Sequence, residues 1–247
     1  MRLVAVDDVG NEYGRSFVDQ FFPRPMRADT IRLSTSFMEK VVPEILAQSP
    51  EVRDQGDLLA NYLEINGELR RRNAETLIEL ARDSTPAFAW SEVFLPMPNA
   101  QVMSAFADRR TYTFEDEAVD QQDHLGFDLA SVRRAPIPAA NAGRVVLARY
   151  FGIYGNAVVV DHGYGLMSLY AHLSDLRVGE GETVERGQIL GTSGETGLAG
   201  GDHLHFTMLL NGLPVNPKEW WDDHWLRDRL GRKLGEALPM TREVEDG

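Results

Sequence analysis

The sequence predicts a mainly β domain that follows a helical region and precedes a C-terminal helix. From Trp90 onward, short apolar runs alternate with turn residues, a pattern typical of antiparallel β architectures. Before Trp90, apolar residues recur at helical spacing. We therefore expect four parts: a short β segment at 1–33, a helical region at 34–90, a β domain at 91–222, and a C-terminal helix and tail at 223–247.

Composition narrows the classes of partner. The 247 residues are 43% hydrophobic and 26% charged, as in an ordinary globular protein. The net charge of -13 argues against nucleic acid as a partner, because a polyanion needs a basic patch. The one dense basic run, at 70–72, is flanked by glutamates, and we interpret it as a solvated helix face. The absence of cysteine excludes disulfides and thiolate metal sites.

The N-terminal segment reads as short strands, including 3–6, 16–22 and 30–33, with turn residues between them. Residues 5–11, AVDDVGN, resemble the final hairpin of a bacterial immunoglobulin-like domain, although a plain hairpin explains them equally well.

In the helical region, Ser36 and Glu39 form a capping-box pattern that predicts a helix start. A longer helix is expected over 57–83, with an interruption at Asn66-Gly67.

The β domain contains six short apolar runs that we predict to be strands: 93–95, 102–106, 143–149, 157–160, 166–170 and 189–191. The glycine-rich stretch 191–201 lacks the Lys-Ser/Thr that a phosphate-binding loop requires, so we interpret it as a flexible rim. Beyond it, Trp220, Trp221 and Trp225 lie on the apolar side of a predicted amphipathic helix. Packing is the simpler explanation of these tryptophans, and stacking on sugars is the alternative.

Histidine and aspartate gather in two windows. His203 and His205 are two apart in a strand-like run, so both side chains project from one face. His124 and Asp128 are four apart, roughly 13 Å if fully extended, so the chain must bend between them to share an ion. Gly126 permits such a bend. His124, Asp128 and one histidine of the pair would make a three-ligand site that suits zinc, with other first-row divalent ions possible. The plainer alternative to a metal site is that His203 and His205 lie on an exposed strand and that 124–128 is a turn.

Three motifs carry a family resemblance. HLGFD at 124–128, YAHLS at 170–174 and HLHF at 203–206 are similar to the motifs of lysostaphin-type (LytM-like) zinc metallopeptidases, which cut peptide bonds in peptidoglycan. The resemblance covers residues 95–222 and implies an antiparallel lysostaphin-type sheet with a barrel-sandwich hairpin near 178–188. It also implies one zinc ion per chain. The implied zinc ligands are His124, Asp128 and His205, and the implied metal-free catalytic histidines are His172 and His203.

The resemblance implies a zinc endopeptidase acting on peptidoglycan peptides, with metal-activated water and two histidines as acid–base and oxyanion groups. One alternative is a non-catalytic peptidoglycan-binding or amidase-activating module, against which the complete motifs speak. Another is a zinc amidase or esterase. His162 and His224 are interpreted as structural.

The implied substrate places the protein in the periplasm, the cell envelope or outside the cell. No apolar run approaches the roughly 20 residues of a membrane span, and no signal-peptide pattern is visible. We therefore expect an export signal or anchor upstream of Met1. The apolar stripes within 34–90 predict packing against another part of the chain. Such packing either restricts entry to the metal cleft or forms a spacer that leaves the cleft open.

Overall fold

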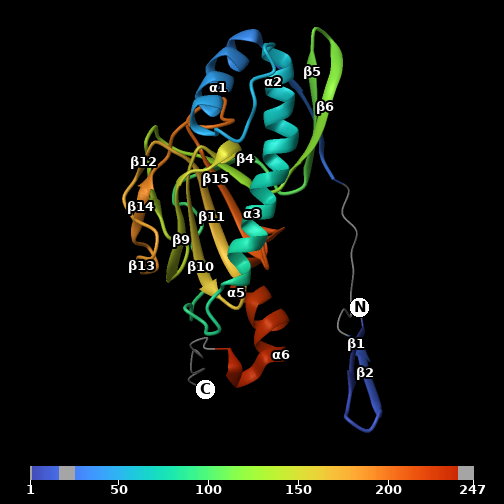
Figure 1. Ribbon diagram of the computed structural model, residues 1–247. Coiled ribbons are helices and arrows are strands. Elements are labelled where there is room, and N and C mark those ends of the chain that lie inside the picture. Colours follow the sequence, from blue (N-terminus) through green and yellow to red (C-terminus); the bar gives the residue numbers. More distant parts are fainter. Residues whose placement is uncertain (1, 17–25, 239–247) are drawn as a thin grey trace.

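The computed structural model describes residues 2–16 and 26–238 and is built on one large antiparallel sheet (Figure 1). Its strand order is β13-β9-β10-β11-β15-β7-β4, with β16 also paired to β15. The antiparallel β prediction is confirmed. The bounds are β4 Gln101–Ser104, β7 Phe127–Ala130, β9 Gly143–Tyr150, β10 Asn156–Gly163, β11 Leu166–Leu173, β13 Thr183–Val184, β15 Leu204–Leu210 and β16 Leu213–Val215.

Both faces of the large sheet are covered. Alternate residues of β10 and β11 enter two different apolar clusters, because successive strand side chains point to opposite faces. Val158 and Tyr170 pack with Trp90 and Phe94 on one face. Val159 and Leu169 pack on the other face, in the cluster that contains Leu77 and Ala81 of helix α3. The two central strands are therefore apolar on both sides.

Two three-stranded sheets flank the large one. The first has the order β3-β5-β6, with β3 Ala28–Arg32, β5 Asp108–Phe114 and β6 Glu117–His124. Here β3 pairs with β5 in parallel, an exception to the antiparallel pattern, and the sequence reading missed the β5–β6 hairpin. The second sheet contains β12 Asp175–Leu176, β14 Ile189–Thr192 and β8 Pro136–Pro138.

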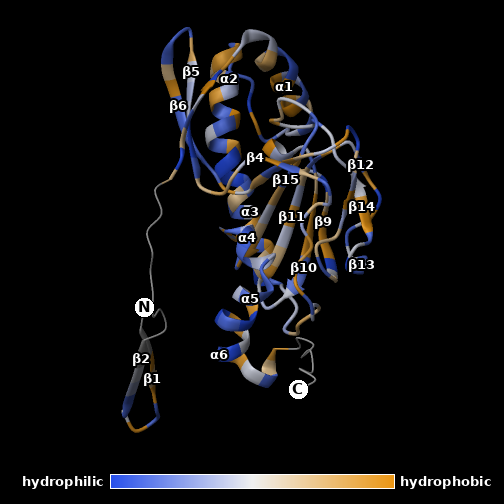
Figure 2. Ribbon diagram, turned by 180° about the vertical axis from the view of Figure 1, so that it is seen from behind, coloured by the Kyte–Doolittle hydropathy of each residue, from blue (hydrophilic) through white to orange (hydrophobic). Residues whose placement is uncertain are grey.

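The helical region consists of α1 Thr35–Gln48, α2 Leu58–Glu64, the π-helix η1 Ile65–Leu69 and α3 Arg70–Arg82. The predicted cap at Ser36 is wrong, because Ser34 Oγ accepts the hydrogen bond of the Phe37 amide at 3.1 Å. Asn66-Gly67 does not break the long helix but lies in its π turn. Both views show the β5–β6 hairpin beside α2 (Figures 1 and 2), where the Tyr62 and Tyr112 rings meet edge to face.

The predicted N-terminal hairpin is confirmed between β1 Arg2–Val6 and β2 Glu12–Ser16. Asp7 Oδ1 accepts the amides of Val9 and Asn11 at 3.0 and 2.8 Å, and Gly10 has a φ of +88°. The immunoglobulin-like assignment stays a prediction, and most of the strand expected at 16–22 falls outside the described residues.

One predicted strand differs in the structure. Residues 93–95 are not a strand, and their amides bond to irregular partners: Phe94 N donates to Trp220 O and Leu95 N to Ala140 O. The predicted C-terminal helix is confirmed. After the short α4 Pro217–Trp220, helical turns follow one another without a break: α5 Asp223–Trp225, the π-helix η3 Leu226–Gly231, α6 Arg232–Leu234 and the 3₁₀ turn η4 Gly235–Ala237. Trp220 is buried against Trp90 and Phe94, so packing accounts for this tryptophan. Within 2–16 and 26–238, no helix has the length and apolarity to cross a membrane.

His162 is structural, as expected. It lies on β10 with no exposed surface, and its Nδ1 donates to Ala142 O at 2.7 Å while Ser168 Oγ lies 2.7 Å from Nε2. His224 is exposed on α5.

His162 should make stability sensitive to acid. Burial lowers the pKa of His162 to about 4, so the folded state favours the neutral ring. The stability that the buried neutral ring contributes is fully present above the unfolded-state pKa of about 6.5. It is lost as the pH falls through the folded-state pKa of about 4. Between these values, the free energy of unfolding of the wild type should fall by up to roughly 3 kcal/mol more than that of His162→Gln. Urea unfolding at several pH values, with a chelator present to remove metal, measures the free energy of unfolding of both proteins. An equal dependence on pH in the wild type and His162→Gln would contradict the prediction.

Candidate metal centre

Three strands bring the predicted metal ligands together. His124 ends β6, Asp128 lies in β7, and the chain turns between them at residues 125 and 126. In the antiparallel pairing of β15 with β7, His205 lies directly opposite Asp128. Two separate pieces of local structure, a bend and a strand register, therefore place the three side chains at one point.

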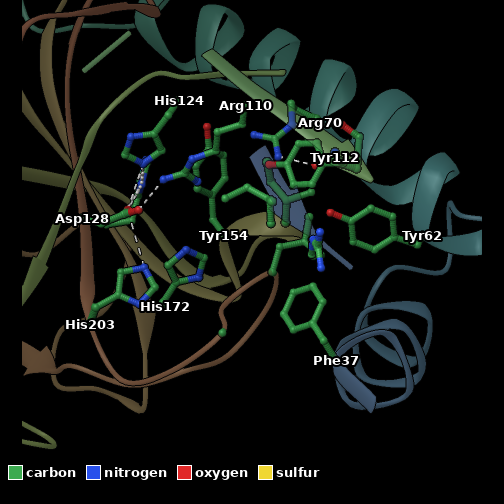
Figure 3. Close-up of a pocket in the computed structure, with 17 residues that line it drawn as sticks. Phe37, Tyr62, Arg70, Arg110, Tyr112, His124, Asp128, Tyr154, His172 and His203 are labelled. Carbon is green, nitrogen blue, oxygen red and sulfur yellow. Dashed lines mark hydrogen bonds and ion pairs between the residues drawn. The ribbon is translucent and has the colours of Figure 1, made fainter. Parts of the chain in front are cut away.

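The donor atoms form a tight triangle. Asp128 Oδ1 lies 2.9 Å from His124 Nε2 and 2.9 Å from His205 Nδ1, and the two nitrogens are 3.1 Å apart (Figure 3). Ligands of a tetrahedral zinc ion at 2.0–2.1 Å are separated by about 3.3 Å. The triangle would need to widen by only a few tenths of an ångström, so these residues fit a zinc ion or a similar divalent cation.

Hydrogen bonds outside the triangle fix which ring nitrogens are free to bind a metal. His124 Nδ1 faces the Ala105 carbonyl at 2.9 Å, which can only accept, so the lone pair is on Nε2. Thr207 Oγ1 donates to Leu125 O at 2.9 Å and lies 3.0 Å from His205 Nε2. The single hydroxyl proton of Thr207 is used in the bond to Leu125 O. His205 Nε2 must therefore donate to Thr207 Oγ1, which leaves the His205 lone pair on Nδ1. Both lone pairs point into the triangle, as metal binding requires.

Gly126 has a different role from the one the sequence suggested. Its φ is not in the left-handed region, so the bend itself does not demand glycine. A Cβ at this position, however, would lie 2.5 Å from Thr207 Oγ1 and 2.6 Å from His205 Nε2. Glycine is required because the bend passes directly over the ring that faces the triangle.

His172 and His203 lie beside the triangle, with their ring centroids 4.8 Å apart. His172 is at the end of β11 with a φ of +63°, a conformation uncommon for a residue with a side chain. His172 Nδ1 donates to Thr196 O at 2.8 Å, and His203 Nδ1 donates to Gly201 O at 2.7 Å. Each ring therefore presents Nε2 as its free nitrogen, and His203 Nε2 is 3.5 Å from Asp128 Oδ1.

The pKa values separate the groups by charge. Burial opposes ionisation of Asp128, but the contacts of its carboxylate with His124, His203 and His205 hold its pKa far below the usual range. Burial lowers the pKa of His205 to about 4 and that of His172 well below its ordinary value. Burial also opposes protonation of His203, yet its contact with Asp128 raises the His203 pKa. The site thus holds one anionic carboxylate and neutral rings at His172 and His205.

Arg110 of β5 holds the outer oxygen of Asp128, and the sequence reading missed it. Its Nη2 donates to Asp128 Oδ2 at 2.8 Å and to Ser104 Oγ at 2.7 Å, and the side chain is only 20% exposed. The carboxylate is thus divided, with Oδ1 toward the imidazoles and Oδ2 toward the guanidinium. Recognising the 108–124 hairpin, which puts Arg110 opposite Gln122 two residues before His124, would have pointed to it.

The triangle lies in a pocket of about 380 Å³ with walls from both halves of the chain. Phe37, Tyr62 and Arg70 line it from the helical region, and Tyr154 lines it from the turn after β9. Packing of the helices against the β domain is therefore confirmed, while restriction of entry stays a prediction. The glycine-rich stretch also contributes Leu198 and Gly200, as expected for a rim.

Comparisons with known proteins agree with this geometry. Residues 122–217 match the model of Peptidase family M23. The chain is 30% identical over 178 residues to the peptidoglycan DD-endopeptidase ShyA of Vibrio cholerae, covering 72% of this chain and 38% of ShyA. It is 42% identical over 94 residues to the DD-carboxypeptidase/endopeptidase Mpg of Neisseria meningitidis, covering 38% of this chain and 22% of Mpg. The chain thus spans well under half the length of both relatives.

A solved structure of an M23-type protein from Pseudomonas aeruginosa superposes with a TM-score of 0.52 at 29% identity, over 62% of this chain and 61% of that one. The fold and the His-Asp-His triangle define a metallopeptidase-type centre. With the family match over the same strands, residues 122–217 belong to peptidase family M23.

Proposed function

We propose that this protein is a zinc-dependent endopeptidase that hydrolyses peptide bonds of bacterial peptidoglycan in the cell envelope. The main support is that five side chains meet in one pocket. Three of them, His124, Asp128 and His205, have donor atoms that face one point, and His172 and His203 each present a free Nε2. Residues 91–222 would form the catalytic unit. The names of the relatives support the substrate class, since ShyA is named a peptidoglycan DD-endopeptidase and Mpg a DD-carboxypeptidase/endopeptidase.

His124, Asp128 and His205 would hold the zinc ion, which lowers the pKa of water and polarises a scissile carbonyl. His172 faces the pocket as a neutral ring anchored at Nδ1, so its Nε2 can take a proton from a water molecule. His203, held by Gly201 O at Nδ1, can donate from Nε2 to the oxyanion or to the leaving amine when its ring is protonated, a state that the contact with Asp128 favours. The anchored rings need no reorientation during reaction.

A non-catalytic module of the same fold remains the alternative. The two pocket-facing rings of His172 and His203 favour the enzyme, because binding alone does not require two anchored rings beside a ligand triangle. Digestion of purified sacculi followed by mass spectrometry tests the proposal. New peptide ends support it, whereas intact peptides with bound zinc would indicate a binding module, and new sugar–peptide or ester products would indicate another hydrolase class.

The proposed ligands should be individually necessary for metal binding. We expect His124→Ala, Asp128→Ala and His205→Ala each to lose stoichiometric zinc and activity, because two remaining donors do not hold the ion tightly. Metal analysis after dialysis measures this, with His162→Gln and His224→Ala as histidine controls outside the triangle. A ligand variant that kept full zinc and full rate would remove that residue from the assignment.

The two flanking histidines should separate catalysis from metal binding. We expect His172→Ala and His203→Ala to retain most of the zinc but to lose on the order of 10²–10⁴ in kcat, the usual size of an acid–base contribution. Zinc content and steady-state kinetics on one muropeptide are measured for the same preparations. Loss of zinc equal to that of His205→Ala would place the residue among the ligands.

Arg110 should tune metal affinity by holding Asp128. In Arg110→Gln, the carboxylate loses its charged partner at Oδ2 and becomes freer to rotate, so we expect zinc affinity to fall roughly 10- to 100-fold. Competition with a fluorescent chelator measures this without any substrate. Arg109→Gln is the matched control, because Arg109 pairs with Asp123 on the exposed side of the same strand. Equal affinities for the wild type and Arg110→Gln would show that Arg110 does not position the ligand.

A further inference from the structure

Arg70 opens α3 and lines the metal pocket from the helical side. Tyr62 and Asn66 line the same pocket at spacings of four residues, so the three side chains form one stripe along the continuous helix. Figure 3 shows Arg70 on the helix side of the pocket and Asp128 on the sheet side. The basic run 70–72 is therefore only partly the solvated face that the sequence suggested.

A π turn shapes this stripe. η1 covers Ile65–Leu69, and the Arg70 amide donates to Ile65 O and Gly67 O. The Arg70 side chain folds back on Asn66, with Nε donating to Asn66 O at 3.0 Å and Nη2 donating to Asn66 Oδ1 at 2.5 Å. π turns inside α-helices frequently occur at functional sites. Arg70 is thus held in a fixed orientation at the pocket wall.

Asn66 is itself immobilised. It has no exposed surface, and its Nδ2 donates to Asp120 Oδ2 at 2.7 Å. That bond turns the amide oxygen toward Arg70. The Asp120 carboxylate and the Arg70 guanidinium are therefore joined through the Asn66 amide.

The neighbours of Arg70 form ion pairs, whereas Arg70 forms none with any residue that the structure describes. Arg71 and Arg72 both bond to Glu68 on the helix surface, at 2.7 and 2.8 Å. Of the other pocket cations, Arg110 pairs with Asp128, and the exposed Arg32 lies 3.8 Å from Asp116. Within 2–16 and 26–238, Arg70 has no carboxylate within 4.0 Å. In a chain of net charge -13, the metal pocket thus holds a cation that forms no ion pair within the described part of the molecule.

Arg70 retains the donors that a carboxylate needs. A guanidinium has five N–H groups, and Asn66 accepts from two of them, which leaves three on the two terminal nitrogens. Two terminal N–H groups match the two oxygens of a carboxylate. The charge of Arg70 also acts on the hydroxyl of Tyr154, a partly buried residue whose ring lies 5.8 Å from that of His205. Arg70 and the metal triangle thus face the same confined space.

We infer that Arg70 is a specificity-determining residue that binds a carboxylate of the peptide substrate, close to the bond that is cut. The inference rests on the proposed function and adds that the preferred substrate is an anionic peptide. Asn66 is the positioning residue that presents the guanidinium. The helical region would therefore contribute to substrate recognition as well as to packing.

The test uses pairs of synthetic cross-linked peptides that carry a free carboxylate or a carboxamide at one acidic position at a time. For the zinc-loaded full chain we expect kcat/KM to be about 10- to 100-fold higher for the carboxylate at one position, the worth of a charge-assisted hydrogen bond. Arg70→Gln should lose this preference, because its kcat/KM falls far more for the carboxylate peptide than for the carboxamide peptide. Arg70→Lys should keep part of it, and Arg71→Gln, the matched surface control, should keep all of it.

Binding of the same peptide pairs, measured by calorimetry, separates this inference from the proposed function. A carboxylate preference in Kd that Arg70→Gln removes supports the subsite even if no peptide is cleaved, in which case the endopeptidase proposal alone fails. Equal Kd values for both peptides on the wild type overturn the subsite. It is also overturned if Arg70→Gln and Arg70→Lys weaken both peptides equally, because Arg70 would then act only by holding the π turn.

Discussion

The site depends on one carboxylate, that of Asp128, whose side chain is only 14% exposed. Asp128 Oδ1 is shared by His124 and His205 at 2.9 Å, and its other oxygen is held by Arg110. Removing a carboxylate from water to this extent is costly unless each oxygen has a partner, so the partners of Asp128 must be placed accurately. The β7–β15 register, the bend at Gly126 and the β5–β6 hairpin each supply one of its partners.

The same constraint explains why backbone carbonyls matter at this site. Ala105, Thr196 and Gly201 each present a carbonyl to a ring nitrogen, which sets the tautomer of one histidine. A carbonyl only accepts, so the opposite nitrogen is left with its lone pair. None of these carbonyls belongs to a residue type that sequence inspection would select, yet they decide which atoms face the pocket.

The helical region extends the site rather than merely covering it. α3 packs on the face of the large sheet through Leu77 and Ala81, which fixes the preceding π turn at the pocket wall. In the stripe formed by Tyr62, Asn66 and Arg70, the guanidinium of Arg70 is the charged group that faces the pocket. Contact between the two halves of the chain therefore creates a pocket with a metal centre on one side and a cation on the other.

The amino-acid sequence by itself determined the antiparallel β domain, the helical stripes and the residue types of the metal triangle. These are local signals, because strand alternation, helical spacing and the HxH and HxGxD motifs are all read within a few residues. His172 was selected only through the family resemblance, since a lone histidine in a strand carries no spacing signal.

Only the tertiary structure decided which side chains complete the site. Arg110, Tyr154 and Arg70 reach the pocket from three elements that meet through packing, and no periodicity in the chain links them. The reason that position 126 is glycine is also tertiary, because the close neighbour is Thr207, 81 positions later. Long-range contacts of this kind fix orientation and charge pairing, which residue type and spacing do not specify.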